Sequence, residues 1–173
     1  MKELRLSGSG GQGLITAGII LAEAAIAEGK EAVQSQSYGP EARGGASKAE
    51  VIISDKFIYH PKVVSPGVVL AMTQQAADKY SADLVEGGLL IIDTDLVPNP
   101  PQGKKIISVP ITRLSTEKLG RDLFANIIAL GLLVKVTGVV TIETIKKAVA
   151  HRVPPHTVDK NMEALMIGYQ SIQ

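Results

Sequence analysis

The residues best suited to bind a charged ligand form a glycine-rich segment near the start of the chain. Gly8-Ser9-Gly10-Gly11-Gln12-Gly13 stands between a short apolar strand pattern and a helix pattern of small residues. Glycines permit a tight turn and a close approach of the backbone to a ligand, and the free N–H groups of the first helical turn point toward it. Gly8, Gly10 and Gly13 also match the G-x-G-x-x-G dinucleotide pattern. The segment predicts an anion site, with a purely structural tight turn as the alternative.

A nicotinamide dinucleotide site needs a further residue that this sequence lacks. Such sites place an acidic residue about 20 positions later, at the end of the second strand, where it binds the ribose hydroxyls; an Arg there accommodates a 2′-phosphate. The corresponding stretch reads Val33-Gln34-Ser35-Gln36-Ser37. A stand-alone dinucleotide-binding domain, such as a dehydrogenase, is therefore a secondary interpretation.

A second segment with chemical potential covers residues 36–45 and combines glycine, proline and charge between two strand patterns. Tyr38 offers a ring and a hydroxyl, Arg43 a permanent planar cation, and Gly44 and Gly45 a close backbone approach. Because parallel sheets bind ligands at the carboxyl ends of their strands, we expect this loop beside the glycine segment. The alternatives are an ion pair of Arg43 with a nearby carboxylate and a packing or interface role for Tyr38.

The remaining polar residues do not form a catalytic set. His60, His151 and His156 are dispersed among predicted loops, and we assign them no catalytic role. Asp93 and Asp95 follow an apolar strand pattern and are expected either to cap local backbone or to face the same crevice. No nucleophile–base pair is recognisable, so the sequence predicts a binding platform without catalytic residues of its own.

Composition excludes several classes of function. The 173 residues predict one domain, 1–173, with an aliphatic core, because 45% are hydrophobic but only 3% aromatic. The net charge of +1 argues against a nucleic-acid partner. The absence of cysteine means that the chain cannot ligate an iron–sulfur cluster through thiolates. Apolar runs of about eight residues are too short for a membrane span, and no signal-peptide pattern is present, so we expect a cytoplasmic protein without membrane contact.

Strand and helix patterns alternate over most of the chain, which predicts an α/β fold. We expect a three-layer α/β/α, Rossmann-like domain with a mostly parallel sheet covered on both faces and a helical C-terminal third packed on it. The first two strands and the helix between them should form a βαβ unit. Strands are predicted at residues 3–7, 31–35, 46–54, 68–72, 89–93 and 105–109, and helices at 14–28, 74–84, 114–119, 123–135, 142–150 and 158–168.

Several of these motifs together resemble the gamma subunit of 2-oxoacid:ferredoxin oxidoreductases. The likeness lies in Gly8–Gly13 followed by Ala17-Gly18, in Tyr38-Gly-Pro-Glu-Ala-Arg-Gly-Gly45, and in Glu50-Val-Ile-Ile-Ser-Asp55, and it continues through Asn126 to Gly168. It covers essentially the whole chain. The second string is far more specific than the glycine pattern. It is most similar to the 2-oxoglutarate enzyme, then to the branched-chain (2-oxoisovalerate) version, whereas pyruvate versions vary it more.

The resemblance implies a subunit of a larger enzyme. Alpha and beta subunits would hold thiamine diphosphate with Mg²⁺, and electrons would leave through [4Fe-4S] clusters, including those of a ferredoxin-like delta subunit, to external ferredoxin. The acyl group would pass to coenzyme A, and the gamma subunit would hold no cofactor alone. The two segments described above, residues 8–13 and 36–45, would line the shared site and help to bind coenzyme A. Alternatively, they would only dock neighbouring subunits. A purely structural interface subunit is a further alternative. The expected cofactor-binding residues are Gly8, Gly10, Gly11, Gln12, Gly13, Tyr38, Arg43, Gly44 and Gly45.

Overall fold

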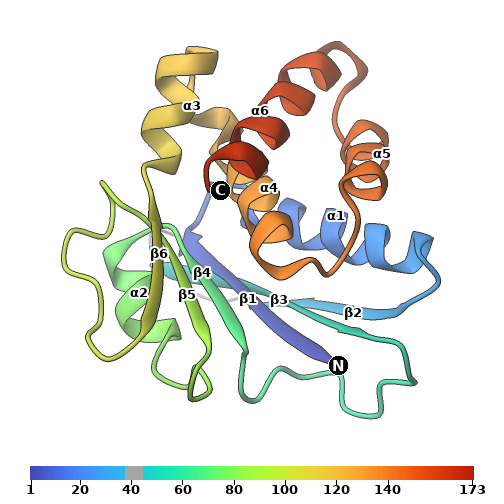
Figure 1. Ribbon diagram of the computed structural model, residues 1–173, viewed down its shortest axis with the longest axis vertical. Helices are drawn as coiled ribbons and strands as arrows, with labels where there is room; N and C mark the ends of the chain where they lie inside the picture. Colours follow the sequence, from blue (N-terminus) through green and yellow to red (C-terminus); the bar gives the residue numbers. More distant parts are fainter. Residues whose placement is uncertain (38–44) are drawn as a thin grey trace.

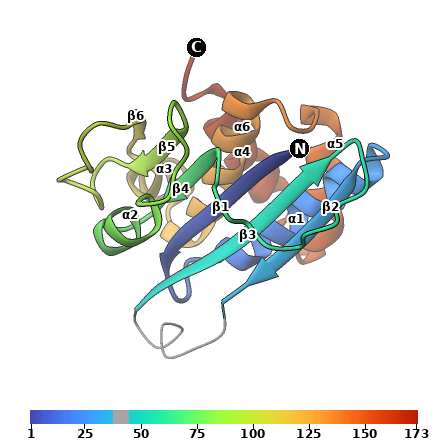
Figure 2. The same cartoon turned by 90° about the horizontal axis from the view of Figure 1, so that it is seen from below.

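The computed structural model describes residues 1–37 and 45–173 and contains one sheet, shown in Figures 1 and 2. Its six strands lie in the spatial order β2-β3-β1-β4-β5-β6. The strands at residues 46–54, 89–93 and 105–109 have the bounds predicted from the sequence. The strands are β1 (Lys2–Ser9), β2 (Glu31–Gln36), β3 (Ala46–Ser54), β4 (Val68–Ala71), β5 (Leu89–Asp93) and β6 (Lys105–Val109).

The sheet is mostly parallel, as expected, but its first half corrects the predicted βαβ unit. Among the described strands, β3 alone is antiparallel to its neighbours, and it lies between β1 and β2. The reason is the short connection after β2. A parallel return needs a crossover of a dozen or more residues, whereas residues 37–45 suffice only for an antiparallel pair. As a result, Ala46 at the start of β3 pairs with Ser9 at the end of β1.

Helices cover the two faces of the sheet unequally, as Figures 1 and 2 show. The predicted packing of the helical C-terminal third on the sheet is confirmed. On one face lie α1 (Leu14–Ala27), α4 (Ala125–Thr137), α5 (Ile142–Arg152) and α6 (Val158–Gln170), with α3 (Ile111–Leu119) at the end of β6. Among the described helices, α2 (Gln74–Tyr80) alone covers the other face. Two 3₁₀ turns, η2 (Asp122–Phe124) and η3 (Pro155–Thr157), precede α4 and α6.

The helical face is held by close backbone packing between α4 and α6. A Cβ added to Gly168 would overlap the carbonyl of Ile128, and one added to Gly131 would overlap the carbonyl of Leu165. Glycine is therefore required at both positions, because the backbones of α4 and α6 are too close for a Cβ. These glycines let a mainly aliphatic layer, which includes the fully buried Leu130, pack closely.

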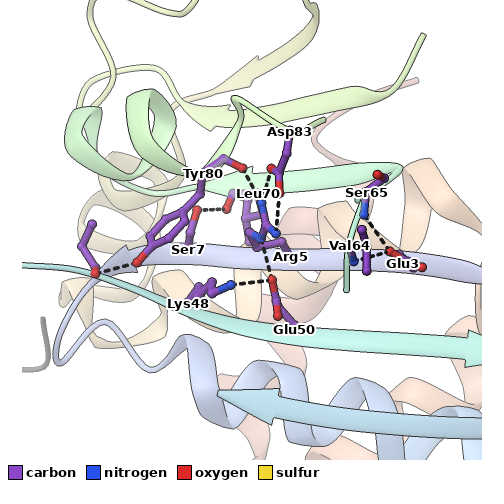
Figure 3. A network of polar contacts seen from close by, with 11 residues as sticks. Glu3, Arg5, Ser7, Lys48, Glu50, Val64, Ser65, Leu70, Tyr80 and Asp83 are labelled. Atoms are coloured by element: carbon purple, nitrogen blue, oxygen red, sulfur yellow. Dashed lines mark hydrogen bonds and ion pairs between the residues drawn. The ribbon is translucent and has the colours of Figure 1, made fainter. Parts of the chain in front are cut away.

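The opposite face carries a network of charged residues centred on the buried Arg5 in β1 (Figure 3). Arg5 is 4% exposed; its Nε donates to Oε1 of Glu50 at 2.7 Å, and its Nη1 and Nη2 donate to Asp83 at 2.5 and 3.0 Å. Burial alone would lower the pKa of Arg5, but the hydrogen bonds to Asp83 and Glu50 outweigh it and raise that pKa. The hydrogen bond from Arg5 lowers the pKa of Asp83.

The same arginine explains why α2 is shorter than predicted. The helix ends at Tyr80 and not at Leu84, because Nη1 of Arg5 donates to the Tyr80 carbonyl at 2.9 Å. The N–H of Leu84 donates instead to the carbonyl of Ser81 at 3.2 Å. A charged side chain far away in the sequence thus ends the helix.

Candidate functional site

The glycine-rich segment connects β1 to α1 and leaves the start of that helix open. Gly11 and Gly13 have positive φ values, 88° and 77°, which side chains with a Cβ rarely adopt. Gly13 precedes the first residue of α1, and no described side chain caps the first amides of that helix. Their N–H groups, together with the helix dipole, favour a negatively charged group at this position.

Gln12 shapes this loop from within. Its Oε1 accepts a hydrogen bond from the N–H of Ser9 at 2.8 Å, and its Nε2 donates to the carbonyl of Met72 at 3.4 Å. A Cβ at Gly8 would overlap Oε1 of Gln12, so Gly8 is needed for this arrangement. Gln12 therefore braces the loop against β4, and its predicted contact with a cofactor stays a prediction.

A second brace comes from Asn126 at the start of α4. Its Nδ2 donates to the carbonyl of Gly13 at 3.1 Å, and its Oδ1 accepts from the N–H of Ile127 at 2.9 Å. A Cβ on Gly13 would lie 2.6 Å from that Nδ2. The two residues are 113 positions apart, so no local pattern indicates this contact, although Asn126 belongs to the resemblance noted from the sequence.

Two pockets of similar size flank the loop. One, about 360 Å³, is lined by Gly11, Gln12, Gly13, Thr16, Met72, Thr112, Asp122, Leu123, Ala125 and Asn126. The other, about 350 Å³, is lined by Ser9, Gly10, Gly11, Gly13, Leu14, Ile15, Ser37, Ser47 and Lys48. In the described part of the chain, two buried side-chain polar atoms lack a hydrogen-bond partner, Oγ1 of Thr112 and Oγ of Ser37, and each belongs to a residue lining one pocket. Unpaired buried hydroxyls are uncommon, and a bound ligand or water would satisfy them.

Charge distinguishes the two pockets. The second is lined by Lys48, whose Nζ also contacts Oε1 of Glu50 at 2.8 Å. The first is lined by Asp122, in the turn before α4. An anion is therefore favoured on the Lys48 side of the glycine loop, where a cation and the helix start act together.

The second predicted segment, residues 36–45, meets the site at Ser37, which lines the second pocket. Tyr38, Arg43 and Gly44 lie outside the described residues, whereas Gly45 is partly buried directly before β3. The N–H of Ser37 donates to the carbonyl of Lys48 at 3.2 Å. The described ends of this segment therefore lie at the same sheet edge as the glycine loop, as expected from the sequence.

Asp93, the last residue of β5, has a structural role. Asp93 is fully buried; its Oδ2 accepts from the N–H of Thr112 at 2.7 Å and its Oδ1 from the N–H of Asp95 at 3.0 Å. Asp93 therefore caps the start of α3, one of the two roles expected for it. Within residues 1–37 and 45–173, no cluster of three potential metal ligands occurs, and no helix has the length and hydrophobicity to cross a bilayer.

Known proteins resemble this chain over nearly its whole length. The sequence pattern of the pyruvate ferredoxin/flavodoxin oxidoreductase family matches residues 3–171, so the chain belongs to this family. It is 48% identical to 2-oxoglutarate synthase subunit KorC of Methanocaldococcus jannaschii, over 98% of this chain and 92% of that protein. The keto/oxoacid ferredoxin oxidoreductase gamma subunit of Geobacter sulfurreducens superposes with a TM-score of 0.90 at 52% identity, covering 99% and 98% of the two chains.

Within the family, the chain is a gamma subunit of a 2-oxoacid:ferredoxin oxidoreductase, as the sequence motifs predicted. A more distant relative has another chain organisation. Ketoisovalerate oxidoreductase subunit VorA of Methanothermobacter marburgensis is 34% identical over 131 residues, which are 75% of this chain but only 27% of VorA. In VorA the gamma-type segment is thus part of a much longer polypeptide.

Proposed function

We propose that this gamma subunit serves a 2-oxoglutarate:ferredoxin oxidoreductase and seats an anionic part of coenzyme A in the shared active site. The 48% identity to a 2-oxoglutarate synthase subunit favours 2-oxoglutarate over the branched-chain and pyruvate alternatives. The observation that carries the coenzyme A role is the open start of α1 with Lys48 lining the pocket beside it. Phosphates of coenzyme A are suitable ligands for backbone N–H groups beside a cation.

The described residues divide this work among themselves. The amides after Gly13 bind the anion, Lys48 supplies charge, and Ser37 offers an unpaired hydroxyl. Gln12 and Asn126 fix the loop, so that these donors are held in place before the ligand arrives. Arg43, outside the described residues, is proposed as a second cation at the same site.

Partners supply what this chain lacks. A sequence without cysteine has no thiolate ligands for iron–sulfur clusters. Thiamine diphosphate, Mg²⁺ and [4Fe-4S] clusters are therefore proposed to be held by alpha, beta and ferredoxin-like delta subunits in the cytoplasm, with ferredoxin as the external electron acceptor. On this basis the isolated chain has no turnover, and measurable turnover by the purified gamma subunit would exclude the subunit role.

The decisive experiment measures the affinity of the assembled enzyme for coenzyme A. Arg43→Ala and Lys48→Met should each weaken it about tenfold or more, because a charged hydrogen bond contributes about 1.5–3 kcal/mol. Lys147→Met, on the exposed surface of α5, is the matched control and should leave it unchanged. Unchanged affinity in both site variants would instead favour a purely structural interface subunit. Saturable NAD(H) binding by the isolated chain would favour the dinucleotide alternative.

The choice of 2-oxoacid is tested separately by the same assembled enzyme. We expect kcat/KM for 2-oxoglutarate to exceed that for 2-oxoisovalerate and for pyruvate. A higher value for either competitor would reassign the substrate and leave the coenzyme A proposal standing.

A further inference from the structure

The connection between β3 and β4 is unusual because it is long, lacks regular structure and is nevertheless anchored. We call residues 55–66 the strap; none of them is in a helix or strand. Oε2 of Glu3 accepts hydrogen bonds from the N–H groups of Val64 and Ser65 at 3.0 and 3.1 Å (Figure 3), and Oγ of Ser54 accepts one from Lys56 at 3.1 Å. Loops of this length without secondary structure are uncommon in compact domains and are frequently functional.

The strap places large apolar side chains in solvent. Phe57 is 67% exposed, Tyr59 82% and Val64 70%. The rings of Phe57 and Tyr59 meet edge to face with their centroids 5.0 Å apart, whereas Ile58 between them is partly buried. The whole sequence has only six aromatic residues, and two of them form this exposed pair. Aromatic side chains are enriched in the buried cores of protein–protein interfaces.

The strap lies on the sparsely covered face of the sheet and away from the glycine loop. In Figure 2 it crosses in front of β3, on the side opposite α1, α4, α5 and α6. It leaves β3 after Ser54, which pairs with Glu31 at the start of β2, and returns to Val68, which pairs with Leu4 near the start of β1. The glycine loop is at the other end of β1, so the strap can be altered without changing the proposed coenzyme A site.

We propose that the strap docks a catalytic subunit of the complex, one of those proposed above to hold thiamine diphosphate, and that the remainder of VorA is the counterpart of this subunit. This inference rests on the proposed function, because it requires a multi-subunit oxidoreductase. In VorA the gamma-type segment is 27% of one polypeptide, so its neighbour is held by the chain itself. KorC of M. jannaschii, 92% of which is matched, has little sequence beyond this domain. Two domains in one polypeptide meet at a high effective concentration, which separate subunits lack. Separate subunits therefore need affinity from side chains at their surfaces, and the exposed rings of the strap can provide it.

The charges around the rings indicate the chemistry of the partner surface. The strap carries the exposed Lys56 and Lys62 and one carboxylate, Asp55. The docking surface on the catalytic subunit is accordingly an apolar pocket for Phe57 and Tyr59 with an acidic rim. Rim charges of this kind accelerate association and make it salt-dependent, whereas the buried rings determine the dissociation rate.

The test is reconstitution of the full gamma chain with the purified catalytic subunit, followed by measurement of the dissociation constant. Phe57→Ser with Tyr59→Ser should weaken binding at least 30-fold, mainly through faster dissociation. Lys62→Glu should slow association and reduce its salt dependence. Ile26→Ser, on α1 and 57% exposed, is the matched control and should bind as the wild type does. Thermal unfolding of all variants should remain at the wild-type temperature, because the altered side chains are exposed.

The outcomes separate this inference from the proposed function. Wild-type gamma subunit that fails to bind the catalytic subunit would refute the proposed function itself. Wild-type binding together with equally tight binding by the double variant would overturn the strap inference alone. A wild-type gamma homodimer that the double variant converts to a monomer would also overturn it, because the occupant would be a second copy. Retained affinity for coenzyme A, measured with the double variant driven into the complex at high subunit concentration, would support the separation of strap and site.

Discussion

The two faces of the sheet are held by different physical means. On the helical face, α4 and α6 approach until only hydrogen fits at Gly131 and Gly168, and the layer is mainly aliphatic. On the other face, one short helix packs on a smaller apolar cluster and is also held by the ion pairs of Arg5 with Glu50 and Asp83, beside an exposed strap. The first face is specified mainly by shape, whereas the second adds directional polar bonds to a smaller apolar cluster. We infer that the second face is the one left available to another subunit.

The candidate site lies where these two regions meet. Asn126, from α4 on the helical face, binds the carbonyl of Gly13. Lys48, from the opposite face, shares Glu50 with Arg5 and lines the pocket beside the glycine loop. Substitutions on the helical face should change the free energy of unfolding through packing. Substitutions around Arg5 on the opposite face should change it through buried charge.

The largest effect is expected for Arg5→Met. Removing the guanidinium leaves Glu50 buried with Lys48 alone, and breaking a buried ion pair costs about 3–5 kcal/mol. The free energy of unfolding from denaturant titration measures this loss. Arg5→Met combined with Glu50→Leu should recover most of it, since both buried charges are then removed together. A double variant as unstable as the single one would show that shape, and not charge, holds this face.

A smaller loss is expected for Gly168→Ala on the helical face. Its new methyl group must displace the carbonyl of Ile128, and such overpacking costs about 1–3 kcal/mol. Gly18→Ala is the matched control in α1, because the nearest neighbours of its Cβ would be side chains and not backbone: Ala49 at 3.2 Å, Val51 at 3.6 Å and Gln34 at 3.8 Å. It should be nearly neutral in the same titration. Equal losses in both variants would contradict the assignment of tight backbone contact to α4 and α6.

Sequence patterns predict local structure here better than they predict pairing. Strands 46–54, 89–93 and 105–109 were predicted to the residue, because runs of apolar residues between turn signals are local features. The position of β3 between β1 and β2 was not predicted, because strand order depends on pairing between segments that are distant in the sequence. The end of α2 was missed because Arg5, 75 positions away from Tyr80, determines it.

The same limit applies to the candidate site. The glycine segment is recognisable because its chemistry lies in consecutive residues. The brace from Asn126 depends on how α4 docks against α1, and Thr112 reaches its pocket through the capped start of α3. These contributions come from tertiary packing, which a motif does not contain.

A more modest change is expected for Tyr80→Phe. The Tyr80 hydroxyl donates to the carbonyl of Ala46 at 2.9 Å, and Tyr80 is 7% exposed (Figure 3). Losing this buried hydrogen bond should cost about 1 kcal/mol. Amide hydrogen exchange should also accelerate at the start of β3, which the hydroxyl attaches to α2. Unchanged exchange there would mean that pairing with β1 alone holds Ala46.

An effect of similar size to that of Tyr80→Phe tests a polar contact within the helical face, and it disappears at low pH. Oε1 of Glu28 accepts from the N–H of Thr141 at 2.7 Å, and Oε2 from Nζ of Lys30 at 2.9 Å. Burial alone would raise the pKa of Glu28, but these bonds outweigh it and lower that pKa from 4.5 to about 2. The carboxylate thus stabilises the fold above pH 4.5, and this contribution disappears as the pH falls toward 2.

Glu28→Gln should accordingly cost about 1 kcal/mol at neutral pH, and the difference from wild type should shrink steadily between pH 4.5 and 2. Denaturant titrations at several pH values measure it. Glu23→Gln is the control: its ion pair with Arg152, 3.3 Å long, joins two exposed side chains and should contribute almost nothing at any pH. A pH-independent loss for Glu28→Gln would mean that the contact acts by shape. The helical face would then lack a charge-dependent contact at this position, and its difference from the Arg5 face would be sharper still.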